Sequence, residues 1–277
     1  MKIRIISAVV ATILLVPFLI FSDTIAFPIM LSLAACLGVY EMCKCLGKQN
    51  FVVLLPSLAY ATLLTMCARG FGNGQEFFNF AHKIFVVYMF YILVVAVFSK
   101  GVFDISDMTM LALAVYFIVN GFSSIVLLRD YQFGQYIYLL VFLCPWCTDI
   151  FAYFTGYFFG KHKLIPDVSP KKTVEGAIGG TLCCAGGLVL YGFILSKFVD
   201  GLRPNYLALL VVGIVLSVVS QCGDLVFSLI KRKYGIKDYG NIMPGHGGVL
   251  DRFDSVIATA PFVLLMFDLF GIARLFG

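Results

Sequence analysis

The densest polar stretch of this chain lies near its C-terminal end, between Ser228 and Asp254. It combines cationic side chains, carboxylates and a glycine-rich turn, in a chain of which only 13% of the residues are charged. Lys and Arg side chains bind phosphate oxygens, glycine turns expose backbone N–H groups to anions, and carboxylates supply the oxygen ligands that Mg²⁺ prefers. The stretch therefore predicts a site that handles phosphate with a metal ion.

Three carboxylates are predicted to act in catalysis and to bind Mg²⁺. Asp224 lies four residues after Ser220 and four before Ser228, so the three share one face of a predicted helix. Asp251 and Asp254 are three residues apart at the start of the next apolar segment and also share a face. A carboxylate in an apolar segment is costly unless it faces protein, water or a metal. Two alternatives stay open, namely an ion pair of Asp224 with a lysine and simple helix capping by Asp251 and Asp254.

Basic residues and glycines near these carboxylates are predicted to hold substrate phosphates. The Ser-Pro-Lys-Lys-Thr sequence at 169–173 precedes a predicted helix, so its lysines, the hydroxyl of Thr173 and the helix dipole are expected to contact phosphate together. The alternative for the basic loop that contains it is that it only fixes the membrane topology. The predicted phosphate- and substrate-binding residues are Lys171, Lys172, Ser228, Lys237, His246, Gly247, Gly248 and Arg252, with Lys231 and Arg232 acting in catalysis and Asp149, Ser220 and Gln221 as candidate supporting residues.

Transmembrane helices are expected to position these residues. The chain has 277 residues, of which 61% are hydrophobic, and its charged fraction is about half the roughly 25% of a soluble domain. A helix of about 20 apolar residues crosses a bilayer and satisfies its own backbone groups there. We therefore expect an all-α integral membrane protein, a polytopic bundle of about nine helices. The segments are 5–22, 24–41, 51–68, 82–99, 108–128, 136–159, 176–196, 205–230 and 254–275.

Lys and Arg residues are distributed unevenly between the two sides of this bundle. Fourteen of the 20 fall at the N-terminus or in loops after the second, fourth, sixth and eighth segments. The positive-inside rule makes this side cytoplasmic. We also divide the chain at the point where polar groups begin to enter the segments. Residues 1–135 are expected to serve packing, lipid contact or oligomer formation, and 136–277 to form a catalytic region with cytoplasmic loops 160–176 and 231–252.

Small residues and cysteines in the apolar segments are interpreted as packing features. Glycines between 176 and 187 would let helices approach closely. Most of the nine cysteines lie in apolar segments, where Cys behaves as a small hydrophobe. Cys144 and Cys147 have the spacing of a redox pair, but they lack the βαβ context that such a pair requires.

The polar motifs after residue 144 resemble the signature of the phosphatidate cytidylyltransferases, also called CDP-diacylglycerol synthases. The resemblance covers roughly residues 144–260, whereas the N-terminal half resembles the family only as a set of apolar helices. Its elements are Asp149 with Ala152-Tyr153, Gly160 to Lys163, Ser169 to Gly176, Gly223-Asp224, Ser228, Lys231-Arg232, Lys237-Asp238, His246-Gly247-Gly248, Asp251-Arg252 and Asp254.

This resemblance implies that CTP and phosphatidate give CDP-diacylglycerol and pyrophosphate. It also implies Mg²⁺ as cofactor, a bacterial inner-membrane location with the active site facing the cytoplasm, and no nucleic-acid partner. The alternatives are a cytidylyltransferase for a different lipid phosphate and an ion-coupled membrane transporter. Whether the chain forms a homodimer is left open.

Overall fold

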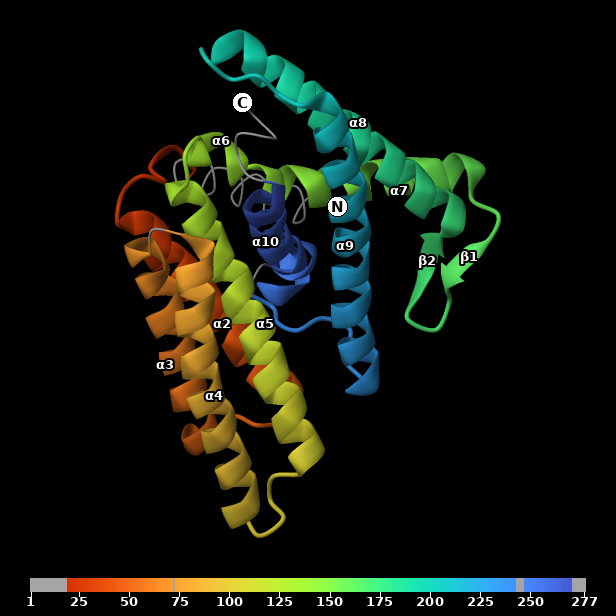
Figure 1. Cartoon of the computed structure of the whole chain (residues 1–277). Helices are drawn as coiled ribbons and strands as arrows, with labels where there is room; N and C mark the ends of the chain where they lie inside the picture. Colours follow the sequence, from red (N-terminus) through yellow and green to blue (C-terminus); the bar gives the residue numbers. More distant parts are fainter. Residues whose placement is uncertain (1–18, 72, 243–246, 271–277) are drawn as a thin grey trace. The chain divides into compact units, whose positions relative to one another are not determined.

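The computed structural model describes residues 19–71, 73–242 and 247–270 (Figure 1). Among these residues, seven helical segments are long and apolar enough to cross a membrane. They are Ala26–Cys45, Phe51–Gly70, Gly74–Phe98, Ile105–Asp130, Gly134–Phe159, Val174–Phe198 and Tyr206–Lys233. The expected class, an all-α polytopic membrane protein, is thereby confirmed.

The seven segments coincide with seven of the nine predicted ones. The first predicted segment, 5–22, falls almost wholly outside the described residues. The last corresponds to helix α10, Leu250–Phe270, which begins four residues earlier than predicted and is not among the seven. The count of nine therefore stays a prediction.

Several helices begin at a polar side chain that caps the first turn. Asn50 accepts a hydrogen bond from the N–H of Val52 at the start of α3 (Phe51–Cys67). Asn73 and Asp104 cap α4 (Gly74–Phe98) and α5 (Ile105–Asp130) in the same way. Such side chains satisfy N–H groups that have no partner within the helix. Short polar connections in the sequence therefore determine where α3, α4 and α5 begin.

Contacts divide the chain into two units. Unit 1 contains residues 1–131 and 233–253, and unit 2 contains residues 132–232 and 254–277. The chain thus changes unit after Tyr131, close to the division at 135 that polar content suggested. Most of the 231–252 loop, assigned from the sequence to the catalytic region, belongs with the N-terminal helices.

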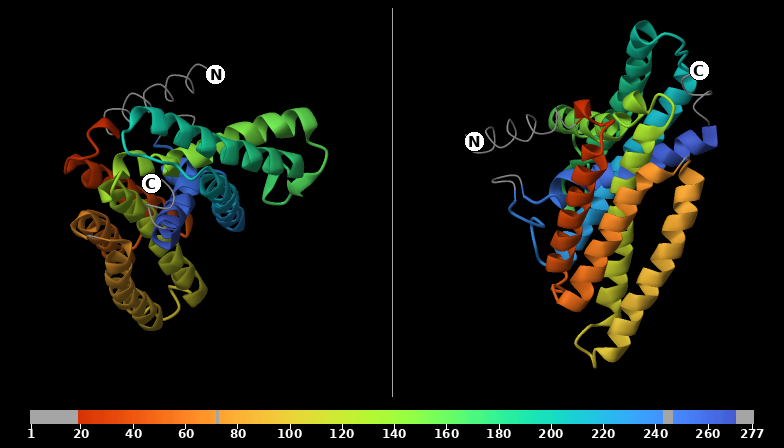
Figure 2. Two further views of the ribbon diagram at one scale, coloured as in Figure 1. Left: turned by 45° about the horizontal axis from the view of Figure 1, so that its top comes forward. Right: turned by 90° about the vertical axis from the view of Figure 1, so that its left-hand side faces the viewer.

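Unit 1 is built around α5, which packs against α2 (Ala26–Cys45), α3 and α4. Figure 2 (right) shows these four helices running side by side. Phe122, Leu111 and Ile118 of α5 are fully buried. Burial of such side chains contributes about 1.5–3 kcal/mol each in water, although within a bilayer close packing supplies more of the stabilisation.

The polar ends of unit 1 show how its helices alternate in direction. At one end Arg69 contacts the backbone of Ser22 and pairs with Asp130 at 3.3 Å. Ser22 ends the first predicted segment, and Arg69 and Asp130 follow the third and the fifth. At the other end Lys48 pairs with Asp107 at 3.1 Å, and the hydroxyl of Tyr234 donates to Asp107 at 2.8 Å. The loops after the second, fourth and eighth segments therefore meet at one end, in agreement with the predicted alternation.

Unit 2 contains α7 (Leu140–Phe159), α8 (Val174–Phe198) and most of α9 (Tyr206–Lys233), after a short helix α6 (Gly134–Ile137). Helices α7 and α8 approach closely through glycines. A Cβ on Gly180 would lie 2.7 Å from the carbonyl oxygen of Thr148, and one on Gly176 would lie 2.7 Å from that of Ala152. The packing role predicted for the glycine-rich start of this segment is confirmed.

A two-stranded antiparallel hairpin, not expected from the sequence, joins α7 to α8. Strands β1 (Lys163–Ile165) and β2 (Ser169–Thr173) pair Lys163 with Thr173 and Ile165 with Ser169. The N–H of Val168 donates to the carbonyl of Ile165 at 3.3 Å and closes the turn. Pro166 sits at the second position of this turn, which its fixed φ favours. Pro166-Asp167 is thus a turn signal within the predicted loop 160–176.

All nine cysteines are free. Cys144 and Cys147 lie one turn apart in α7, and each takes part in close helix packing. The thiol of Cys147 donates to the carbonyl of Cys183 at 3.6 Å, and the thiol of Cys184 donates to the carbonyl of Cys144 at 3.6 Å. These contacts support packing rather than a redox pair.

Candidate active site

The polar face of α9 forms the centre of the candidate site in unit 2. The hydroxyl of Ser228 donates to Oδ1 of Asp224 at 3.3 Å, as their spacing of four residues predicted. On its other oxygen, Oδ2, Asp224 forms an ion pair with Nζ of Lys172 at 2.6 Å. The alternative interpretation of Asp224, an ion pair with a lysine, is therefore observed, and the lysine comes from the hairpin.

Two further carboxylates interact electrostatically with Asp224. Asp149 of α7 is influenced by both Asp224 and Lys172. Asp254 of α10 is influenced by Asp224, Lys231 and Asp149. Four elements, α7, β2, α9 and α10, therefore bring three carboxylates and two ammonium groups into one cluster. The sequence alone offered no partner for Asp149, because its partners lie on other elements.

The donor atoms of this charge cluster are of the type that divalent cations take. All its acidic ligands are oxygens, which suit Mg²⁺. When all five groups are ionised, three carboxylates and two ammonium groups leave one negative charge, which a bound cation would offset. In the described part of the chain, however, no three His, Cys, Asp or Glu side chains are grouped closely enough to hold a metal ion as they stand. The metal assignment of Asp224, Asp251 and Asp254 thus stays a prediction.

Lys231 and Arg232 occupy different surroundings at the end of α9. Only 8% of Lys231 is exposed, and its ammonium group interacts with Asp224 and Asp254. Burial of a lysine is tolerated when its charge is matched in this way. Arg232 is exposed, and its Nε donates to the carbonyl of Val168 at 3.4 Å. It therefore connects the end of α9 to the hairpin turn.

The hairpin presents its two predicted phosphate-binding lysines differently. Lys171 is exposed, whereas Lys172 is half-buried in its pair with Asp224. The hydroxyl of Thr173 was expected to contact phosphate together with them. Instead it accepts a hydrogen bond from the N–H of Gly176 at 3.1 Å and caps α8. The competing demand is the N–H group at the helix start, which needs an acceptor.

Of the two supporting candidates, Gln221 makes hydrogen bonds in helix packing. Nε2 of Gln221 donates to Oγ1 of Thr181 at 3.0 Å, and Thr148 donates to Ser217 at 2.9 Å. These contacts cross between α7, α8 and α9. Ser220 is fully buried, and its hydroxyl has no hydrogen-bond partner among the described residues.

The glycine-rich loop before α10 belongs to unit 1, and Asp251 organises it. Oδ2 of Asp251 accepts the N–H of Tyr239 at 2.7 Å and the N–H of Gly248 at 2.9 Å. Gly247 has a φ of +87°, and a Cβ there would lie 2.8 Å from the same oxygen. Only glycine combines that backbone conformation with so close an approach. Part of the capping alternative for Asp251 is therefore observed.

The remaining predicted residues of this loop are placed as follows. Lys237 and Arg252 are exposed. His246 lies outside the described residues. The change of unit falls between Phe253 and Asp254, so Asp251 belongs to unit 1 and Asp254 to unit 2, one turn apart on α10. That Asp251 and Asp254 bind one metal ion together with Asp224 is inferred from this helical spacing and stays a prediction.

Sequence analysis missed Glu41, a carboxylate of α2 that is only 2% exposed. Its Oε1 accepts the N–H of Val249 at 2.9 Å, and its Oε2 accepts the N–H of Leu250 at 2.8 Å. The signal that could have found it was a lone acid within an apolar segment, which is costly unless it has partners. The partners lie about 200 residues away along the chain, so no local pattern indicates them.

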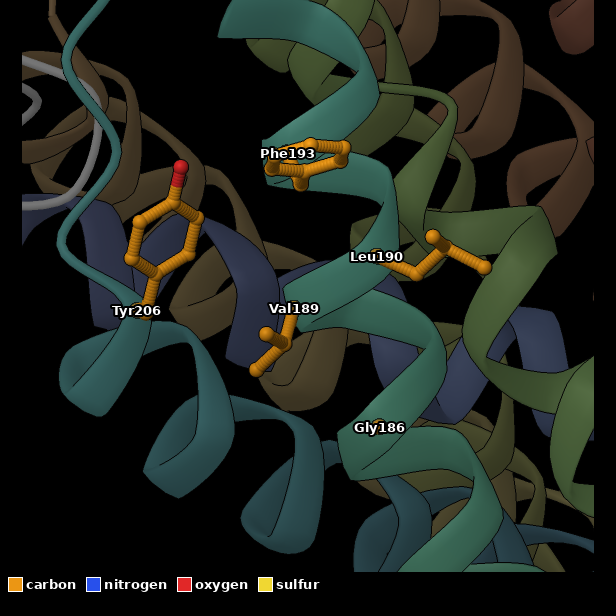
Figure 3. Close-up of a pocket in the computed structure, with 5 residues that line it drawn as sticks. All are labelled: Gly186, Val189, Leu190, Phe193 and Tyr206. Atoms are coloured by element: carbon orange, nitrogen blue, oxygen red, sulfur yellow. The ribbon is translucent and has the colours of Figure 1, made fainter.

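An apolar hollow in unit 2 is distinct from the charge cluster. It is lined by Gly186, Val189, Leu190, Phe193 and Tyr206 (Figure 3). Tyr206 is the first residue of α9, and Asp224 follows 18 residues later. At a rise of about 1.5 Å per residue this separation is about 27 Å along the helix. The residues that line the hollow include no carboxylate and no cationic side chain for phosphate chemistry.

Comparisons with known proteins agree with the resemblance of the motifs and extend it to the N-terminal half. The model of a family described as the cytidylyltransferase family matches residues 2–270. A protein of Staphylococcus haemolyticus is 35% identical over 270 residues, covering 96% of this chain and 98% of its own length. One from Staphylococcus epidermidis is 36% identical over 272 residues (96% and 98%), and one from Bacillus subtilis is 34% identical over 276 residues (98% and 99%). All three are named phosphatidate cytidylyltransferase.

Proposed function

This chain belongs to the cytidylyltransferase family, and we propose that it transfers the cytidylyl group of CTP to phosphatidate, giving CDP-diacylglycerol and pyrophosphate. The observation that carries the proposal is the cluster of Asp149, Asp224, Asp254, Lys172 and Lys231 in unit 2. Family membership also decides against the ion-coupled transporter. The enzyme works in the membrane, because its substrate phosphatidate is a lipid and its helices are those of an integral membrane protein.

The reaction requires positioning and charge stabilisation rather than a nucleophile from the protein. An oxygen of the phosphatidate phosphate forms a bond to the α-phosphorus of CTP. The bond from that phosphorus to the oxygen bridging the α- and β-phosphates breaks, and its electron pair leaves with pyrophosphate. Two anions must therefore be held together against their mutual repulsion, as in other phosphoryl-type transfers.

Lysine and arginine side chains of unit 2 are suited to hold these phosphates. Lys171 and Arg232 are exposed to an incoming anion, whereas Lys172 and Lys231 already face carboxylates. A substrate phosphate near Asp224 would compete for the ammonium group of Lys172. Binding of substrate is thus expected to loosen the ion pair of Lys172 with Asp224.

Asp224 and Asp254, with Asp251 from the adjoining turn of α10, are proposed to hold Mg²⁺. The cation would neutralise phosphate charge and stabilise the leaving pyrophosphate. An ionised Asp149 would make the electrostatic potential of the cluster more negative and so favour the cation. The carboxylates would thus serve both to attract the cation and to keep the lysines oriented.

The active site is proposed to face the cytoplasm of a bacterial cell, at the inner membrane, because CTP is dissolved there and phosphatidate lies in the adjoining leaflet. Single cysteines at Lys171 in the hairpin and at Ile242 in the loop before α10 would be introduced into a variant without reactive native thiols. Both should react with an impermeant reagent only from the cytoplasmic side. Labelling of the two loops from opposite sides would contradict a single site. Whether the chain forms a homodimer stays open. The mass of the detergent-solubilised protein would distinguish a monomer from a dimer.

The decisive experiment incubates the purified protein with labelled CTP, Mg²⁺ and phosphatidate, followed by lipid extraction. We expect label in the lipid fraction with CTP or dCTP, little with ATP or GTP, and none after chelation of Mg²⁺. Selectivity for cytosine would come from polar groups that pair with its edge. Diacylglycerol should not react, because it lacks the nucleophilic phosphate. Reaction with another lipid phosphate but not with phosphatidate would overturn the substrate assignment.

A further inference from the structure

Two carboxylates of unit 1, Glu41 and Asp251, accept hydrogen bonds from the glycine-rich loop, and Glu41 is the more deeply buried of the two. Each of its two oxygens accepts one backbone N–H, from Val249 and from Leu250. These are the N–H groups at the start of α10, where the helix itself supplies no acceptor. The negative charge also interacts favourably with the helix dipole. A residue of α2 therefore caps the helix that carries Asp251 and Asp254.

The loop backbone is fitted around the Glu41 carboxylate. A Cβ on Gly240 would lie 2.4 Å from Oε1 of Glu41, and a Cβ on Gly248 would lie 2.3 Å from the same atom. Real side chains do not approach so closely, so both positions require glycine or a shifted loop. The two ends of the loop, near 240 and near 248, thus close around one side chain from α2.

Asp251 closes the same loop from the other direction. Its Oδ2 accepts the N–H of Tyr239, next to Gly240, and the N–H of Gly248. The two carboxylates therefore hold the same pair of loop segments, and a shift at Glu41 is transmitted to Asp251 through one or two residues. At the start of the loop, the hydroxyl of Tyr234 donates a hydrogen bond to Asp107.

We propose that Glu41 is a positioning residue for the cytidylyl transfer. It does not touch substrate. It fixes the first turn of α10 and the glycine-rich loop, and thereby the direction of the Asp251 carboxylate. The inference deepens the proposed function and rests on it. It also assigns the N-terminal helices a part in the active site, beyond packing and lipid contact.

The first test is Glu41→Gln, which preserves size but replaces one acceptor oxygen by an N–H₂ donor. One backbone N–H then loses its acceptor and faces a donor. We expect kcat to fall about tenfold. The Mg²⁺ concentration for half-maximal activity should rise severalfold, while KM for phosphatidate stays unchanged. Hydrogen exchange of the peptide that contains Val249 and Leu250 should accelerate in the protein without substrate or metal, while α5 stays protected.

A second variant reaches the same contact from the loop. Gly240→Ala places a methyl group against Glu41 and should reproduce the loss of kcat and the local exchange. Gly70→Ala is the matched control, because nothing lies within 4 Å of a Cβ there. The double variant Glu41→Gln/Gly240→Ala should lose less than the product of the two single losses, since both act on one contact.

The outcomes separate the inference from the proposed function. If wild-type protein forms no lipid product from CTP and phosphatidate, the function is wrong, although the exchange result can still establish the structural role of Glu41. If wild type is active and Glu41→Gln matches it in kcat and Mg²⁺ requirement, the positioning role is wrong. A loss of kcat that only follows the loss of folded protein, with unchanged Mg²⁺ requirement, would reduce Glu41 to a structural cap and also overturn the inference.

Discussion

The two units accommodate buried charge in different ways. In unit 1, Glu41 and Asp251 each accept two backbone N–H groups, and Asp107 is matched by Lys48 and Tyr234. In unit 2, Asp224 pairs with Lys172, while Asp149 and Asp254 add negative charge to the same cluster. Carboxylates that repel one another are costly unless positive charge offsets them, so we expect the reaction centre in unit 2. The contacts of unit 1 serve to hold a loop.

The largest expected effect is on the crowded cluster of unit 2. Asp224→Asn preserves size but removes the charge that holds Lys172 and that would bind Mg²⁺. Activity should fall at least about a hundredfold, the scale of losing a key electrostatic contact. The measurement is kcat/KM with labelled CTP, in protein whose elution and melting match wild type. Near-normal turnover would remove Asp224 from the metal assignment.

Asp251→Asn separates the two roles of Asp251, because an amide oxygen can still accept the N–H groups of Tyr239 and Gly248. If charge matters at this position, activity should again fall about a hundredfold while hydrogen exchange of the loop stays close to wild type. Asp251→Ala removes the acceptor as well, and should also accelerate loop exchange. Equal activity of Asp251→Asn and wild type would leave Asp251 with a purely structural role as the acceptor that holds the loop.

A packing variant tests the rigidity of unit 2 without touching charge. Gly180→Ala places a methyl group 2.7 Å from the carbonyl of Thr148, where α7 and α8 meet. Overpacking of this kind costs about 1–3 kcal/mol, so the melting temperature should fall by several degrees. Gly186→Ala on the same helix is the control, because nothing lies within 4 Å of its Cβ. Equal melting of both variants would contradict the close approach.

The smallest effect is expected where the hydrogen bond of Tyr234 to Asp107 holds the start of the loop in unit 1. Burial, and then the hydrogen bond to Asp107, raise the pKa of Tyr234 to about 12, so its hydroxyl is a donor at neutral pH. Tyr234→Phe removes one hydrogen bond, which contributes about 0.5–1.5 kcal/mol. Chemical denaturation should show a loss in this range, and activity should change less than twofold. A larger loss of activity than in Glu41→Gln would show that the contact of Tyr234 with Asp107 matters more for catalysis than the contacts of Glu41.

Local patterns were sufficient wherever neighbours along the chain decide the outcome. The seven membrane-length helices follow from apolar length, and the contact of Ser228 with Asp224 follows from the helical period. The hairpin between α7 and α8 was missed because Pro166-Asp167 was not weighed as a turn. The capping role of Thr173 was missed because its hydroxyl was assigned to a phosphate rather than to the helix start.

The sequence by itself determined that this is a polytopic helical membrane protein with a phosphate-handling motif near its C-terminal end. Composition, apolar length and residue spacing act locally, and a helix satisfies all the backbone groups of one apolar segment within that segment. Tertiary structure alone decided that Lys172 neutralises Asp224, that Asp149 joins the same cluster, and that Glu41 of α2 caps α10. Those pairings join residues about 50 to 200 positions apart, and a buried charge finds its partner only when packing brings the two together.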